Sequence, residues 1–115
     1  MEYCAGLDVS LRSCAICVVD GKGTVLHERD LPCEIEEIAR YLTALPVSIE
    51  RIGFVSGTLS QHLFYGLKAE GFEVVCMEAR QVSAALSAMR NKTDRNDARG
   101  IAQILRTGWF NPVHM

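Results

Sequence analysis

The sequence predicts an α/β domain in which helices flank a mixed sheet of five strands. Two observations support this fold class. Three strand-like segments follow one another through short turns between residues 3 and 31, as in an antiparallel meander. From residue 35 onward, segments with helical spacing of apolar residues alternate with short apolar segments, as in parallel βα units. The 115 residues are enough for one domain, so we expect a single domain over residues 1–115.

The meander is expected to contain strands over residues 3–9, 14–19 and 24–31. The first two are almost continuously apolar, which is typical of strands covered on both faces. Residues 21–23, Gly-Lys-Gly, supply the turn before the third strand, whose polar sequence is typical of a sheet edge. Asp8 is the exception in the first strand. Because Asp is depleted in strands, Asp8 is either the last residue before a turn or directed at a site beyond the strand's end.

The second half of the chain is expected to form six further elements. They are a helix over residues 35–45, a strand over 49–55, a helix with Leu59, Leu63 and Leu67 on its buried face, a strand over 72–77, a helix over 82–89, and a last helix from Asp94 to Thr107. We expect Ser56-Gly57-Thr58 to cap the second of these helices and Gly71 to close it. A break is expected near Asn91.

Asp94 and Asp97 are the most distinctive pair in the last helix. Residues three apart project from the same face of a helix, and Lys92, Arg95 and Arg99 surround the two carboxylates. Paired carboxylates are suitable ligands for a hard cation such as Mg²⁺. The two residues alone also fit a simpler interpretation, in which the helix dipole favours Asp94 and Asp97 is a solvated neighbour. The inward side of this helix should be Ala98, Ile101, Ala102 and Leu105.

Sheets of this type place their sites beyond the carboxyl ends of the central strands. Asp8 would lie there, beside the end of the strand over residues 49–55. The charge distribution adds a weak indication of a polyanionic partner. Residues 1–78 contain six Lys or Arg against twelve Asp or Glu, whereas residues 79–115 contain six against two.

The sequence contains neither a membrane-length apolar run nor a signal peptide, so we expect a cytoplasmic protein with no membrane partner. The five cysteines fit that compartment as reduced core residues. Cys14 and Cys17 form a Cys-x-x-Cys, but residues three apart on a strand point to opposite faces. We therefore expect core cysteines here and no metal site.

Three motifs resemble a known family. They are Gly-Leu-Asp-Val-Ser at 6–10, Gly-Thr-Leu-Ser at 57–60, and Asn-Lys-Thr-Asp-Arg-Asn-Asp-Ala-Arg-Gly at 91–100, which is followed by Ala-Gln-Ile-Leu-Arg-Thr-Gly-Trp-Phe at 102–110. Together they resemble the N-terminal domain of DEDD insertion-sequence transposases of the IS-one-ten family. The resemblance implies an RNase H-like (RuvC-like) fold, and it covers nearly the whole chain.

The resemblance also implies a function, which is DNA transposition by phosphodiester cleavage and strand transfer. In the family, four acidic residues bind Mg²⁺ or Mn²⁺, and Asp8, Asp94 and Asp97 match three of them as catalytic and metal-binding residues. The second acid, a glutamate, does not carry over, because Val55 stands at its position. A valine cannot ligate a cation, so we expect a weakened site. Lys92, Arg95 and Arg99 are candidates for phosphate contacts or for balancing the charge of the acids.

The partners implied by the resemblance are DNA, an element-encoded guide RNA in some members, and further copies of the full-length protein. The family's C-terminal domain, with its catalytic serine, would follow beyond Met115, so we expect the chain to be a fragment. Two alternatives remain. One is a non-catalytic module that binds nucleic acid or self-associates, which Val55 favours. The other is a nucleotide-binding ATPase of the same topology, whose glycine-rich phosphate loops the sequence lacks.

Overall fold

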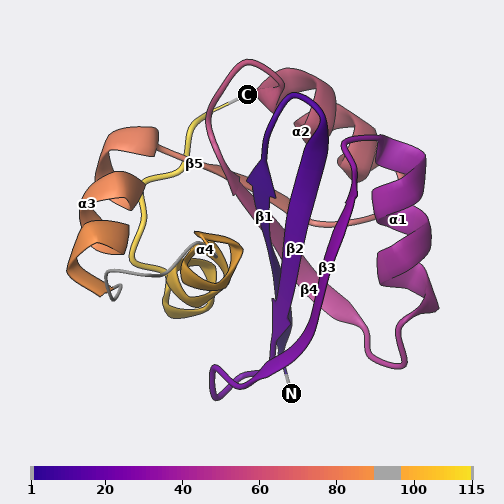
Figure 1. Cartoon of the computed structure of the whole chain (residues 1–115), viewed down its shortest axis with the longest axis horizontal. Coiled ribbons are helices and arrows are strands. Elements are labelled where there is room, and N and C mark those ends of the chain that lie inside the picture. Colours follow the sequence, from indigo (N-terminus) through magenta and orange to yellow (C-terminus); the bar gives the residue numbers. More distant parts are fainter. Residues whose placement is uncertain (1, 90–96, 115) are drawn as a thin grey trace.

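The domain has three layers, with a five-stranded sheet between two pairs of helices (Figure 1). This computed structural model describes residues 2–89 and 97–114. The strands are β1 (Tyr3–Val9), β2 (Ser13–Val19), β3 (Val25–Pro32), β4 (Ile49–Val55) and β5 (Val74–Met77). The helices are α1 (Ile35–Ala44), α2 (Ser60–Ala69), α3 (Ala79–Met89) and α4 (Asp97–Thr107). The strand order β3-β2-β1-β4-β5 confirms the predicted mixed sheet.

β1 joins the antiparallel and parallel parts of the sheet, because it pairs antiparallel with β2 and parallel with β4. Leu7 on β1 stands opposite Phe54 on β4, and both side chains belong to the core beneath α1 and α2. Successive side chains of a strand point to opposite faces. The next residues, Asp8 and Val55, therefore point toward α3 and α4, at the carboxyl ends of neighbouring strands.

The β2–β3 hairpin has a turn stabilised by one carboxylate. Asp20 Oδ1 accepts hydrogen bonds from the backbone N–H groups of Lys22 and Thr24, each at 2.9 Å. Gly23 takes a positive φ of 88°, which favours glycine. β3 lies at one edge of the sheet and is mostly exposed, as its polar sequence predicts.

The face of the sheet beneath α1 and α2, called here the α1/α2 face, carries large buried side chains. Ile38 and Leu42 from α1 and Leu63 and Leu67 from α2 pack there on the apolar residues of the strands. Cys14 belongs to this core, whereas Cys17 belongs to the core on the other face. The two sulfurs of the Cys-x-x-Cys thus lie on opposite sides of the sheet, as expected, and all five cysteines are free thiols.

The opposite face, called the α3/α4 face, is packed more closely. All four residues predicted for the inward side of α4 are buried. Gly6 on β1 lies directly beneath this helix. A Cβ atom on Gly6 would lie 2.7 Å from the carbonyl oxygen of Ala98, and the backbone nitrogen of Ala102 would be closer still. The backbones of α4 and β1 are therefore in contact.

The ends of α2 differ in one respect from the prediction. No side chain of Ser56-Gly57-Thr58 caps the helix, whose N-cap residue is Leu59. The Ser60 hydroxyl instead holds the loop before the helix: it accepts a hydrogen bond from the Gly57 N–H at 2.5 Å and donates to the Gly57 carbonyl at 2.8 Å. At the other end, Gly71 takes the predicted C-terminal glycine position with φ 101°.

β5 begins at Val74, two residues later than predicted, because the backbone N–H groups just before it are hydrogen-bonded to the end of α2. The N–H of Phe72 donates to the Leu67 carbonyl, and the N–H of Gly71 donates to the Lys68 carbonyl, which together form a Schellman motif. β5 also gains a partner that was not predicted. The tail at residues 111–113 runs antiparallel along it, with hydrogen bonds from Glu78 N–H to the Asn111 carbonyl and from Val113 N–H to the Cys76 carbonyl.

The helices in the described part of the chain include none long and apolar enough to span a bilayer. The predicted break near Asn91 and the start of the last helix at Asp94 lie outside the described residues.

Candidate metal centre

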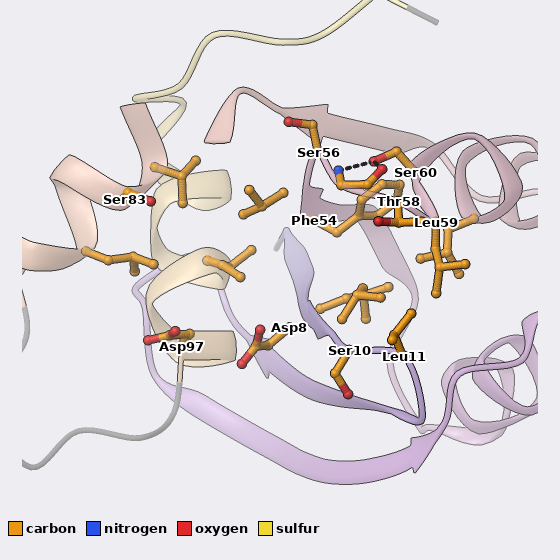
Figure 2. A pocket seen from close by; sticks show the side chains of 18 residues that line it. Asp8, Ser10, Leu11, Phe54, Ser56, Thr58, Leu59, Ser60, Ser83 and Asp97 are labelled. Carbon is orange, nitrogen blue, oxygen red and sulfur yellow. Dashed lines mark hydrogen bonds between the residues drawn. The ribbon is translucent and has the colours of Figure 1, made fainter. Parts of the chain in front are cut away.

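A cavity of about 370 Å³ opens at the carboxyl ends of β1 and β4 (Figure 2). The β1–β2 turn, the β4–α2 loop, α3 and the first turns of α4 surround it. This is the edge of the sheet at which the sequence predicts a site. The cavity is apolar at its base, where Leu7, Phe54 and Ile101 line it, and polar where Asp8 and Asp97 line it.

Asp8 supplies the first carboxylate of the site. It is half-buried near the end of β1, with its side chain on the α3/α4 face. Burial raises the pKa of the Asp8 carboxyl, and the negative charge of Asp97 raises that pKa further. Asp97 is therefore close enough to oppose the ionisation of Asp8, although the two residues are 89 positions apart in the chain.

Asp97 supplies the second carboxylate from the first turn of α4. The backbone contact at Gly6 holds α4 on β1, and Figure 2 shows Asp97 beside Asp8 at one end of the cavity. The structure thus brings together two of the three acids expected to meet. Asp94, the third, lies outside the described residues, as do Lys92 and Arg95.

Val55 occupies the end of β4, in line with Asp8 on the neighbouring strand. Its half-buried side chain packs on the core of the α3/α4 face and lines the same cavity. An apolar side chain thus borders the carboxylates where the family resemblance implies a glutamate. Over residues 2–89 and 97–114, no group of three acidic, histidine or cysteine side chains could hold a metal ion.

Arg99 forms an ion pair that the sequence did not indicate. Its Nε and Nη2 atoms donate to the two carboxylate oxygens of Glu28 on β3, at 2.5 and 2.8 Å. A bidentate pair of this kind fixes the direction of the guanidinium as well as its position. A role for Arg99 in phosphate contact stays a prediction.

Comparison with known proteins identifies the family. The sequence model of the DEDD transposases typified by IS110, described as transposase, matches residues 5–115. The chain belongs to this transposase family. No curated protein matches the chain.

Solved structures agree on the fold of this transposase-family domain. T. thermophilus RuvC, in complex with a Holliday junction substrate, is similar with a TM-score of 0.66 and 15% identity, over 98% of this chain and 100% of RuvC. A fowlpox virus resolvase, also in complex with Holliday junction DNA, has a TM-score of 0.58 and 12% identity, over 94% of this chain and 96% of the resolvase. The fold is therefore RuvC-like, an RNase H-like arrangement, as the resemblance implied.

A third similar structure is the ethanolamine utilization protein EutJ from Carboxydothermus hydrogenoformans, with a TM-score of 0.56 and 16% identity. This chain covers 41% of EutJ, and the match covers 79% of this chain. At identities this low, all three likenesses concern the fold alone.

The transposase domain also has a set of hydroxyl groups at the cavity. They belong to Ser10, Ser56, Thr58, Ser60 and Ser83. The sequence predicts Ser56 at this edge, because it directly follows β4 and residues that follow parallel strands gather at the same edge, but it did not indicate the other four. Nothing in the local sequence of α3 distinguishes Ser83, since only the packing of α3 against α4 brings it to the cavity.

Proposed function

We propose that this domain binds a divalent cation, Mg²⁺ or Mn²⁺, and contributes to phosphodiester cleavage and strand transfer in DNA transposition. One observation carries the proposal: Asp8 and Asp97, from different elements, line one cavity at the carboxyl edge of the central strands. The donor set fits a hard cation, which prefers carboxylate oxygens. A cation would also relieve the repulsion by which Asp97 raises the pKa of Asp8.

The roles of the residues follow from this proposal. Asp8 and Asp97, with Asp94, would hold the cation and so act as the catalytic acids. When bound, such an ion activates an attacking oxygen and stabilises the leaving oxygen of a phosphodiester. Asp8 is placed by β1, and the contact with Gly6 sets how closely α4, which carries Asp97, approaches that strand.

DNA is the proposed partner, since the family is one of transposases and two of the similar structures contain Holliday junction DNA. Lys92, Arg95 and Arg99 are the proposed phosphate contacts. We also propose that the domain works beside a C-terminal domain that carries a serine, in an oligomer of the full-length protein, with an element-encoded guide RNA as a further partner. A cytoplasmic location stays a prediction.

Val55 favours a second candidate function for this chain, which is a non-catalytic module that binds nucleic acid or self-associates. An apolar side chain beside Asp8 removes one oxygen ligand from the site, whereas the excess of Lys and Arg over residues 79–115 does not depend on position 55. The two candidates differ in their dependence on metal. Metal-bridged contact with a phosphate weakens when Asp97→Asn removes a ligand, whereas simple charge attraction strengthens because a negative charge is lost.

Val55→Glu tests the proposal, with Val55→Gln as the matched control of similar shape without charge. In calorimetric titrations with Mn²⁺, we expect Val55→Glu to bind roughly tenfold more tightly than the wild type, because it returns a charged oxygen ligand. Val55→Gln should change the affinity much less. Without metal, Val55→Glu should lower the free energy of unfolding by roughly 1–3 kcal/mol, because the new carboxylate is half-buried beside Asp8.

Equal Mn²⁺ affinity in the wild type, Val55→Glu and Val55→Gln would exclude position 55 from the site. Binding of nucleic acid that persists in EDTA, and that strengthens in Asp97→Asn, would favour the second candidate.

A further inference from the structure

We infer that the ion pair between Glu28 and Arg99 is a positioning contact, which fixes the first turn of α4 and so holds Asp97 beside Asp8. The inference rests on the proposed function, because it assigns to Glu28 and Arg99 a role in the geometry of the proposed cation site. Arg99 is two residues from Asp97 on α4, and Glu28 is on β3, at the edge of the sheet. Among the described residues, Nε and Nη2 of the Arg99 guanidinium donate to the two oxygens of the Glu28 carboxylate.

Polar side chains along one side of α4 bind it to the meander. Gln103 donates to the Gly23 carbonyl at 2.7 Å, and Arg106 is 3.4 Å from the Gly21 carbonyl. Arg99, Gln103 and Arg106 are spaced by four and three residues, so they project from the same side of the helix. Two of these contacts reach the β2–β3 turn, whereas the Arg99 contact reaches β3 from the first turn of α4, two residues from Asp97.

The backbone contact and the ion pair restrict different movements of α4. Contact with Gly6 sets how closely α4 approaches β1, because backbone atoms cannot give way. A close approach alone still leaves the helix able to rotate about its axis or slide along it. The fork of the Arg99 guanidinium on Glu28 resists both movements at the end of the helix that carries Asp97.

A positioning role can be separated from a merely structural one. An exposed ion pair adds little to global stability, so its loss should leave the domain folded. A simple charge effect also predicts the opposite change in cation affinity from the one that a loss of positioning predicts. Removal of the Arg99 charge near two carboxylates would by itself strengthen cation binding, whereas loss of positioning weakens it.

The test is Mn²⁺ titration of the full chain by calorimetry, without nucleic acid, in the wild type, Arg99→Gln and Arg99→Lys. We expect Arg99→Gln to weaken binding about tenfold, as loss of a residue that orients a metal ligand does. Arg99→Lys keeps the charge and loses the forked guanidinium, so its Mn²⁺ affinity should lie between those of the wild type and Arg99→Gln. Arg106→Gln is the matched control, because it removes the same charge from the same side of α4, away from the cavity, and its affinity should not fall.

Amide hydrogen exchange gives a second readout that needs no metal. In an α-helix the N–H groups of Ile101 and Ala102 donate to the carbonyls of Asp97 and Ala98. These two amides should exchange faster in Arg99→Gln, while Arg106→Gln leaves their rates unchanged. The exchange rates therefore test the positioning role even if the titration detects no Mn²⁺ binding.

The outcomes separate the two proposals. Unchanged or tighter Mn²⁺ binding in Arg99→Gln would overturn the positioning role and leave the proposed function in place. A wild-type chain that binds no Mn²⁺ would overturn the cation site. In that case faster exchange at Ile101 and Ala102, confined to Arg99→Gln, would still support the positioning role, and unchanged exchange would overturn it.

Discussion

The two faces of the sheet are packed by different means. On the α1/α2 face, large side chains such as Phe54, Leu63 and Leu67 fill the space between strands and helices. On the α3/α4 face, α4 rests on the backbone of β1 at Gly6, and the acids of the proposed site lie at the end of this contact.

The α1/α2 face therefore contributes mainly to the stability of the domain, and the α3/α4 face mainly to the position of Asp97. A layer filled by long side chains tolerates small shifts of a helix, because rotamers adjust. A layer in which backbones touch cannot adjust in this way, so the contact sets the smallest distance that α4 can have from β1. Asp97 is carried by the helix whose position is fixed, and changes on the two faces should therefore have different effects.

The largest expected loss of stability comes from the α1/α2 face. Leu67→Ala removes a fully buried side chain and should lower the free energy of unfolding by roughly 2–5 kcal/mol. Urea denaturation measures this loss. Mn²⁺ affinity, measured where the variant is folded, should match that of the wild type, and a large decrease would show that the two faces are not independent.

Gly6→Ala should lower the free energy of unfolding somewhat less than Leu67→Ala does, but it should disturb the proposed cation site. The new methyl group meets backbone atoms of Ala98 and Ala102, so we expect a loss of roughly 1–3 kcal/mol, toward the upper end of that range. Mn²⁺ binding should weaken because α4 must move outward with Asp97.

Gly66→Ala on α2 is the matched control for Gly6→Ala. Its methyl group would meet the Cδ1 and Cγ1 atoms of Ile35 at 2.6 and 2.7 Å, so that a side chain and not a backbone would have to shift. The helix gains about 1 kcal/mol from replacement of glycine by alanine, which offsets the crowding. If Gly66→Ala proved as harmful as Gly6→Ala, the contrast between the two faces would be wrong.

Asp8→Asn should produce the smallest change in stability, and it should stabilise the metal-free domain where Leu67→Ala and Gly6→Ala destabilise it. The folded state raises the pKa of Asp8 above its ordinary value of 3.8, so the folded state favours the protonated acid. The stability that this acid contributes is complete below the unfolded pKa and is lost as pH rises through the folded pKa. At pH 7 the ionised carboxylate therefore destabilises the metal-free domain.

Thermal unfolding in EDTA measures this effect. Asp8→Asn should raise the unfolding temperature at pH 7, and the gain should shrink as the pH falls toward 4. Asp97→Asn removes one of the two causes of the raised pKa, so the pH dependence of stability should be weaker in that variant. A gain from Asp8→Asn that is equal at both pH values would contradict the assigned cause.

The sequence was sufficient for the elements that have a regular apolar pattern. The strand over residues 49–55 was predicted with its observed bounds, and the inward side of α4 was predicted residue by residue. Asp8 was found because a carboxylate interrupts an apolar strand. These signals are local, since they depend on alternation along a strand or on helical spacing.

The features that were missed depend on backbone groups or on distant partners. The tail beside β5 is held by main-chain hydrogen bonds, which leave no mark on side-chain pattern. Glu28 and Arg99 are 71 residues apart and meet only after α4 is folded onto the sheet. The expected side-chain cap of α2 is absent, and the Ser60 hydroxyl bonds to both backbone groups of Gly57 in the preceding loop, a contact that composition alone does not determine.

The tail beside β5 has a consequence for the order in which the domain can form. β5 is an edge of the sheet, and an uncovered edge can pair with another chain. Residues 111–113 cover it, and they leave the ribosome after every strand and helix described here. A nascent chain therefore presents this edge unpaired, and open to association with other chains, until residue 113 has left the ribosome and can fold back on β5.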